Sequence, residues 1–199
     1  MSGAFPISSA KFDTMGIQSK QNTIISKSQS GKKLSRQIDG QRFGFTARII
    51  TAKRSDVYGE LMAFIIKQRS QKENFTIIPP EVEDARGTAA GIPHGTASAG
   101  DTSITLGGTG TGTLKAGDFI KFANHDKVYM VVADQSDIST GSLTIEPPLT
   151  TAVSSSTIIY DNVPFTVHLT NDMQEFGTVG ADKDGNLLYK FEIDVEESL

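Results

Sequence analysis

Apolar and polar residues alternate along much of the chain, and this period of two is typical of β-strands. In the N-terminal part, Asn22–Ser28 and Phe43–Ile50 alternate in this way. Asp39-Gly40 lies between them and is typical of a tight hairpin turn, because both residues tolerate the backbone angles that the turn requires. These segments predict two strands paired as a hairpin.

Alternation returns near the C-terminus. The segment "VPFTVHL" (Val163–Leu169) predicts one strand, and "LLYKFEIDVEE" (Leu187–Glu197) predicts a longer final strand. The final strand places five apolar side chains on one face: Leu187, Tyr189, Phe191, Ile193 and Val195. Asp184-Gly185 predicts a hairpin turn between residues 176–179 and this strand.

One segment, Ser55–Ser70, has the period of an α-helix instead. Its predicted buried face carries four apolar residues and one polar residue: Val57, Leu61, Phe64, Ile65 and Gln68. Ser55 is a candidate N-cap, and Gly59 weakens the helix locally. We expect the apolar stripe to pack into the core. Phe75–Ile78 then predicts a strand that ends at Pro79-Pro80, because proline cannot donate to a strand ladder.

The middle of the chain has shorter strands and more turns. Five strands are predicted between residues 102 and 160: "TSITL", "FIKFA", "KVYMVVA", "SLTIE" and "STIIY". This spacing is typical of a small barrel or sandwich. The preceding run, from Glu81 to Asp101, has no period and predicts a connector.

The glycine-rich stretch Gly107–Gly112 raises the alternative of a phosphate-binding loop. Thr113 stands where a Walker A loop needs its lysine, and also where a dinucleotide fingerprint needs its third glycine. No helical period follows, since Gly117-Asp118 is itself a turn signal. We therefore expect turns that connect strands.

The strand pattern of the first part returns after Asn162, which predicts a discontinuous domain. We expect residues 1–90 and 160–199 to form a β domain with the helix 55–70, and residues 91–159 to form an inserted β module. The expected fold class is mainly β: a β-sandwich or split barrel with one packed α-helix, carrying a small barrel-like insertion.

Composition and charge narrow the function. The net charge of −4 gives no electrostatic case for a nucleic-acid-binding surface, and the absence of cysteine excludes disulfides and thiolate sites. No apolar run approaches the ~20 residues that span a bilayer. Residues 1–13 lack the pattern of a signal peptide, so we expect no secretion by that route.

The candidate catalytic and metal-binding groups do not have the spacing that such sites require. His94, His125 and His168 lack the short spacings of a zinc site. An EF-hand fit of residues 180–191 places Gly180 and Phe191 at ligand positions, which excludes it. Acidic pairs such as Asp172 with Glu175 are common on protein surfaces. We predict no catalytic residue, no cofactor and no metal site, and hence no enzyme. The alternative to this prediction is a hydrolase whose site has no recognisable motif.

A basic stretch in the N-terminal hairpin region carries Lys32, Lys33 and Arg36. A short charge run is commonly a solvated face. The alternative is a docking surface. We expect residues 27–42 to form an arm that is too polar to pack in the core. Lys32, Lys33 and Arg36 in this arm are the candidate subunit interface.

The order of several segments resembles tailed-bacteriophage tail-tip proteins, of the distal tail or minor tail (baseplate hub) family. These segments are "QRFGFTARI", "AFIIKQRSQKENFTIIPP", "LKAGDFIKFANHDKVYMVV", "LTIEPPL" and "PFTVHLTNDMQEF". The resemblance extends from about Gln21 to Leu199. It implies a non-enzymatic subunit whose tube-like β domain assembles into a ring, commonly hexameric or trimeric, around the tail channel.

The resemblance also implies the partners and the location. These are self-association, other phage tail proteins (tail tube, hub, tail fibre), and DNA only in passage through the lumen. The location is the tail tip of the virion, after synthesis in the host cytoplasm. The alternative function is a glycan-binding β module that recognises the host surface; the absence of tryptophan counts against it, while Tyr129 and Tyr160 are the aromatic candidates.

Overall fold

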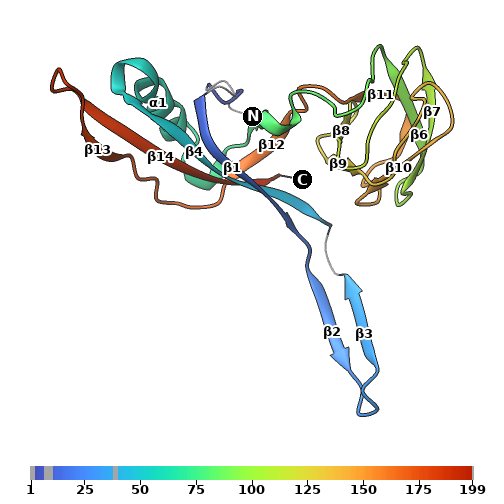
Figure 1. Cartoon of the computed structure of the whole chain (residues 1–199). Coiled ribbons are helices and arrows are strands. Elements are labelled where there is room, and N and C mark those ends of the chain that lie inside the picture. Colours follow the sequence, from blue (N-terminus) through green and yellow to red (C-terminus); the bar gives the residue numbers. More distant parts are fainter. Residues whose placement is uncertain (1–2, 7–10, 38–39, 199) are drawn as a thin grey trace.

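The structure is a computed structural model that describes all residues except 1–2, 7–10, 38–39 and 199. Figure 1 shows three parts: a twisted sheet covered by one helix, a separate barrel, and a long two-stranded arm that extends away from both. The described residues confirm the mainly-β class, with a single α-helix and a barrel module.

The sheet has six strands, all antiparallel to their neighbours, and its core face is apolar. Its order is β1 (Phe12–Lys20), β4 (Arg42–Lys53), β14 (Leu187–Glu197), β12 (Phe165–Leu169) and β5 (Phe75–Ile77), with β13 (Gly177–Ala181) also paired to β14. Every second residue along the two long central strands is buried: Phe43, Phe45, Ala47, Ile49, Phe191, Ile193 and Val195. The predicted C-terminal strands and their hairpin are therefore confirmed.

The predicted N-terminal hairpin has a different pairing. The segment Asn22–Ser28 contains β2 (Thr23–Lys27), which pairs with β3 (Lys33–Gln37) through a turn at residues 28–32. β4 pairs instead with β1, a strand that the local pattern did not predict. Asp39 lies outside the described residues, so the expected turn at Asp39-Gly40 is not described. The expected pairing of Asn22–Ser28 with Phe43–Ile50 is wrong.

The helix is present but shorter than predicted. α1 (Gly59–Lys67) follows a π-helical turn, η2 (Arg54–Tyr58), and Ser55 is not its cap: the Ser55 hydroxyl donates to Asp56. Arg69 and Ser70 have φ angles of 54° and 64°, which end the helix before the predicted residue 70.

The predicted apolar stripe does face the core. Leu61 and Ile65 are buried against the sheet. Phe64 is partly buried and meets the Phe5 and Phe75 rings edge-on, with centroids 5.7 and 5.3 Å away. Two short 3-10 turns, η3 (Ser70–Lys72) and η4 (Pro80–Val82), flank β5.

The middle segment closes into a six-stranded barrel. The strand order is β10 (Ser142–Glu146), β7 (Ser103–Gly108), β6 (Pro93–Ala97), β11 (Val153–Ile159), β8 (Phe119–Phe122) and β9 (Val128–Val131). Five of these strands were predicted. The sixth, β6, lies in the segment expected to be a connector. Its Gly95 faces the barrel interior, where a Cβ would lie 2.6 Å from Phe122 and 2.9 Å from Ile104, so glycine is required there.

The glycine-rich stretch connects strands, as expected. It leaves β7 after Gly108, and Thr111 then exchanges backbone hydrogen bonds with Ala90 at 2.8 and 2.9 Å. Gly112 has a φ of 85°, and a Cβ there would lie 2.1 Å from the Thr88 carbonyl oxygen. The glycines therefore permit two backbone segments to approach closely.

The chain enters and leaves the barrel at one place. The Asn162 N–H donates to the Glu83 carbonyl at 2.8 Å, and the flanking Val82 and Val163 are both buried in the core of the sheet. An insertion whose ends lie together leaves the host fold able to close without it. We therefore propose two folding units, as predicted, but with the boundary at the Glu83–Asn162 contact and not at residues 90 and 160, because Ala85 and Ala89 pack against the barrel core.

Joining Glu83 to Asn162 through two glycines should therefore leave a folded protein. We expect a cooperative thermal transition at a lower temperature than that of the full chain, because the barrel covers part of the sheet core, including Phe43 and Phe165. Circular dichroism during heating measures this. A non-cooperative melt or aggregation on expression would contradict the two-unit proposal.

Candidate assembly surfaces

The expected arm, residues 27–42, corresponds to the hairpin of residues 23–37 in the structure, and we call this hairpin the arm. It is the most exposed element of the described chain. All residues of β2 and β3 are exposed, and in Figure 1 the arm projects well beyond the sheet. The turn at its tip is set locally: Gly31 has a φ of 79°, its N–H donates to the Ser28 carbonyl, and the Ser28 N–H donates to the Lys32 carbonyl. Its strands pair only with each other among the described residues.

Three large apolar side chains on the arm are exposed to water. Ile24, Ile25 and Leu34 retain 55%, 55% and 56% of their accessible surface. A two-stranded hairpin is marginally stable alone, because it has no core to bury such side chains. A surface supplied by another molecule would bury them, so the arm is a candidate interface element.

The arm is also strongly basic. It carries Lys27, Lys32, Lys33 and Arg36 and no acidic residue, and none of the four makes an ion pair with a described residue. Lys27 lies directly opposite Lys33 in the ladder, an arrangement of like charges that destabilises an isolated pair. The structure brings the three predicted interface residues onto one hairpin, with Lys32 in the turn and Lys33 and Arg36 on opposite faces.

The two edges of the sheet differ. At β5, the Phe5 N–H donates to the Thr76 carbonyl at 2.7 Å and the Thr76 N–H donates to Gly3, so residues 3–5 cover that edge. At the other edge, β1 pairs only with β4 among the described residues. Its outer backbone groups are available to a strand from another molecule.

The sheet face opposite the core is polar. Glu196 pairs with Lys20 at 3.0 Å and with Arg42 at 3.5 Å, and Arg48 pairs with Glu192 at 3.8 Å. The Thr46 hydroxyl donates to Asp194 at 2.7 Å. These contacts cross from strand to strand, so this face suits water and polar partners better than an apolar interface.

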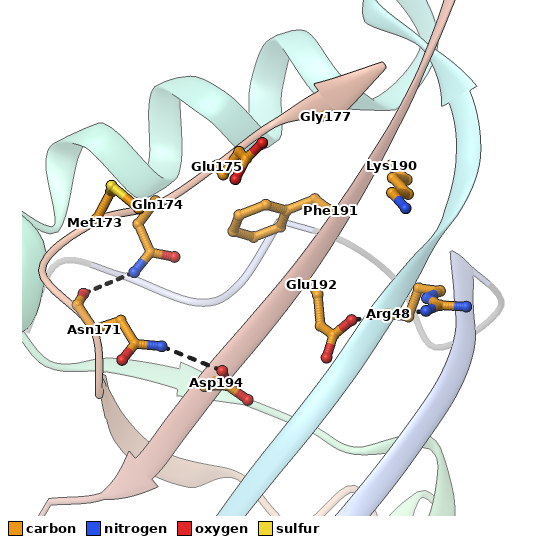
Figure 2. Close-up of a pocket in the computed structure, with 10 residues that line it drawn as sticks. All are labelled: Arg48, Asn171, Met173, Gln174, Glu175, Gly177, Lys190, Phe191, Glu192 and Asp194. Carbon is orange, nitrogen blue, oxygen red and sulfur yellow. Dashed lines mark hydrogen bonds and ion pairs between the residues drawn. The ribbon is translucent and has the colours of Figure 1, made fainter. Parts of the chain in front are cut away.

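A groove of about 410 Å³ lies on this face, between β14 and the segment 171–177. Figure 2 shows the residues that line it. Its lining includes Phe191, whose ring stacks on that of Phe176 with centroids 4.5 Å apart. Met173 stands at its rim with 80% of its surface exposed. Asp172 and Glu175, the acidic pair considered from the sequence, lie exposed on the segment that borders it.

The barrel and the sheet meet at a buried ion pair that the sequence patterns did not indicate. Lys127, just before β9, donates to Glu197 at the end of β14; their side chains are 2% and 0% exposed. The Glu197 carboxylate also accepts from the Val128 N–H at 2.8 Å and the Phe43 N–H at 3.2 Å. Burial lowers the pKa of Lys127, and the charge of Glu197 opposes that shift. We call this cluster the junction.

Apolar contacts surround the junction. The Phe119 ring of β8 lies edge-on to Phe43 and Phe165 of the sheet, at 5.3 and 5.8 Å between centroids. The Lys127 ammonium lies 4.8 Å from the centre of the Phe43 ring. Val128 is buried within the core of the sheet rather than that of the barrel. The barrel is therefore held in one orientation by packing as well as by charge.

The three histidines lie apart, on β6 (His94), in the β8–β9 turn (His125) and on β12 (His168). His125 is partly buried and makes two side-chain contacts: its Nε2 lies 2.8 Å from the Tyr129 hydroxyl and its Nδ1 lies 2.8 Å from Asn124 Oδ1. Burial lowers the pKa of His125, assisted by the charge of Lys121. Among the described residues, no three His, Asp or Glu side chains gather as a metal site would require.

Residues 84–163, which contain the whole barrel, match the family model of the B domain of distal tail protein pb9. No curated protein matches the chain.

The match confirms the resemblance to phage tail-tip and distal tail proteins. It supports a structural role in a phage tail, association with other tail proteins and a location in the tail of the virion, and it favours a non-enzymatic protein. In the part of the chain that the structure describes, no helix is both long and apolar enough to cross a bilayer.

Replacing Lys127 by Met should strongly destabilise the protein at pH 7, because Glu197 keeps its buried charge and loses its counter-ion. Breaking a buried pair in this way costs about 3–5 kcal/mol of unfolding free energy. The double variant Lys127→Met with Glu197→Gln should recover much of the loss, because no buried charge remains. Urea titrations of the three proteins measure the coupling. Lys115→Met, which breaks the exposed pair with Asp134, should change little; equal losses at both lysines would contradict this account.

Stability should fall as the pH drops below about 6.5, the ordinary pKa of histidine. Because the pKa of His125 is lower in the folded chain than in the unfolded chain, the unfolded chain binds a proton at a higher pH. The free energy of unfolding therefore falls from about pH 6.5 down to the folded pKa. Thermal melts at pH 7.5 and pH 5.5 should show a smaller difference for His125→Gln than for the native chain. His94→Gln is the control; if it reduces the difference as much, His125 is not the source.

Proposed function

We propose that the protein is a subunit of a ring at the tip of a phage tail, and that the ring surrounds the channel through which DNA passes. The observation that carries the proposal is the arm, with three exposed apolar side chains and four cations that have no described counter-ion. We propose Lys32, Lys33 and Arg36 as part of the subunit contact.

A projecting arm can join subunits into a ring. The arm and the surface that receives it are different parts of one molecule, so each subunit can pass its arm to the next, and such head-to-tail contacts produce a ring when they close. The open edge of β1 offers a second element for such a contact. The acidic balance of the chain, −4 in total, suits a lumen along which DNA slides without binding.

The barrel has a separate place in this proposal. It lies to one side of the sheet in Figure 1, away from the arm, and the junction fixes its orientation. A barrel held in this way would face outward from the ring, where it could contact the tail tube, the hub or a tail fibre.

The alternative of glycan binding has less support from the aromatic residues. Tyr129 is fully buried, with its hydroxyl 3.0 Å from Thr150 Oγ1. Tyr160 donates from its hydroxyl to the Gly91 carbonyl at 3.0 Å, which ties its ring edge to the barrel wall. Neither tyrosine therefore presents a free, projecting ring of the kind that stacks on sugars, and we prefer the ring assembly.

Removing the arm should leave a folded monomer. Thr23 and Gln37 are opposite each other in the ladder, so residues 24–36 can be replaced by Asn-Gly, which forms a two-residue hairpin turn. Sedimentation velocity should show the native chain as a closed oligomer and the shortened chain as a monomer with unchanged circular dichroism. Assembly of the shortened chain to the native mass would contradict the proposal.

The electrostatic part of the contact can be tested separately. Changing Lys32, Lys33 and Arg36 to Ser should weaken assembly and reduce its dependence on salt, because screening acts on charged contacts. The matched control changes Arg54, Lys72 and Lys183 to Ser, which removes the same charge from exposed positions outside the arm. Equal weakening by the two triple variants would attribute the effect to net charge and not to the arm.

A further inference from the structure

We propose that the arm of one copy binds in the groove of a second copy, between β14 and the segment 171–177. This inference rests on the proposed ring assembly and names the surface that receives the arm. It follows from three observations: the shape of the groove, the distribution of charge along the chain, and the side chains that share one face of the arm.

The groove has the form of a preformed receptor site. Its volume of about 410 Å³ lies within the usual range of binding pockets, about 300–1,000 Å³. The segment that borders it is held in place: Gln174 donates to the Asn171 carbonyl at 2.7 Å, Asn171 donates to Asp194 at 3.3 Å, and the Ser70 hydroxyl donates to the Asp172 carbonyl at 2.7 Å. Figure 2 shows the first two of these contacts. A rigid wall loses little entropy when a partner binds.

Charge on the two surfaces is complementary. The arm carries four cations and no acid, whereas the groove is lined by three acidic residues, Glu175, Glu192 and Asp194, and by two cations, Arg48 and Lys190. At the groove, Glu175 is exposed and makes no ion pair with a described residue, and Glu192 is shared only with Arg48, across 3.8 Å. Complementary potentials guide association and select the partner. A chain with both surfaces therefore favours contact between its own copies.

One face of the arm combines two apolar side chains with a cation. Ile24 lies opposite Arg36 in the ladder, and Leu34 is two residues from Arg36, so these three side chains share a face. The apolar pair can cover Met173, which has 80% of its surface exposed at the rim. The Arg36 guanidinium would then meet Glu175, and a charge-assisted pair of this kind adds direction to the contact.

The groove of the same copy does not receive the arm. All residues of the arm are exposed, and Figure 1 shows it extending away from the sheet on which the groove lies. The contact is therefore between molecules, and it joins two different surfaces, as a ring requires.

Cross-linking tests the contact directly, because the native chain contains no cysteine. We would mix Leu34→Cys protein with Met173→Cys protein under mild oxidation and follow the dimer band on a non-reducing gel. We expect a strong band for this pair. The control replaces Met173→Cys by Thr144→Cys, an exposed position on the barrel, and should give a weak band. Equal bands for the two mixtures would overturn the proposal.

A charge exchange tests the same contact without cross-linking. Arg36→Glu and Glu175→Arg should each weaken association, by about tenfold or more, as expected for close charge pairs across an interface. The double variant Arg36→Glu with Glu175→Arg should regain most of the native affinity. If the double variant is as weak as the sum of the single changes, the two residues do not meet and the proposal fails.

Sedimentation of the native chain separates this inference from the proposed function. If the native chain assembles and the arm deletion prevents it, but the cross-link and the charge exchange fail, the ring proposal stands and the groove is not the receiving surface. If the native chain stays a monomer at every concentration and the cross-link fails too, both proposals fall.

Discussion

A carboxylate that is removed from water needs a compensating charge and hydrogen-bond donors, and Glu197 obtains these from two separate parts of the chain. The Phe43 N–H comes from the sheet, while the Val128 N–H and the Lys127 ammonium come from the barrel. A buried charge without a partner is costly. If the barrel moved away from the sheet, Glu197 would either be exposed to water or stay buried without its partners. Such a cluster adds little net stability. It does fix the orientation of the barrel on the sheet, because only one relative placement satisfies all of its partners.

Local pattern predicted most of the elements in this protein, and long-range pairing accounts for most of what was missed. The alternation in Leu187–Glu197 and the helical period of Leu61 and Ile65 are local signals, and both are present in the structure. The strand that pairs with β4 was missed because β1 is mostly exposed and places only Phe12, Met15 and Ile17 against the core, with a register shift between Phe12 and Thr14 that interrupts the alternation. β6 gave no signal because Gly95 must be small where the barrel interior is narrow.

The candidate interface was predicted from charge alone, and the structure adds what charge cannot show. Lys32, Lys33 and Arg36 were identifiable as a basic run, but Ile24 was predicted only as part of a strand and Leu34 was not singled out, and the structure shows both exposed. Glu197 was open to prediction, since it continues the inward-facing series that ends with Val195, and a charged residue at that position needs a buried partner. Lys127 carries no comparable signal, because it precedes its strand within a turn.

Gln41 links the end of the sheet from which the arm projects to the barrel. It lies beside the base of the arm, is 2% exposed, donates to Ser19 at 2.9 Å and accepts from Lys127 at 3.1 Å. The arm is a separate ladder that continues from the end of the β1–β4 ladder, and Gln41 joins this end of the sheet to Lys127 of the barrel. A subunit held by its arm would therefore present its barrel at a defined angle.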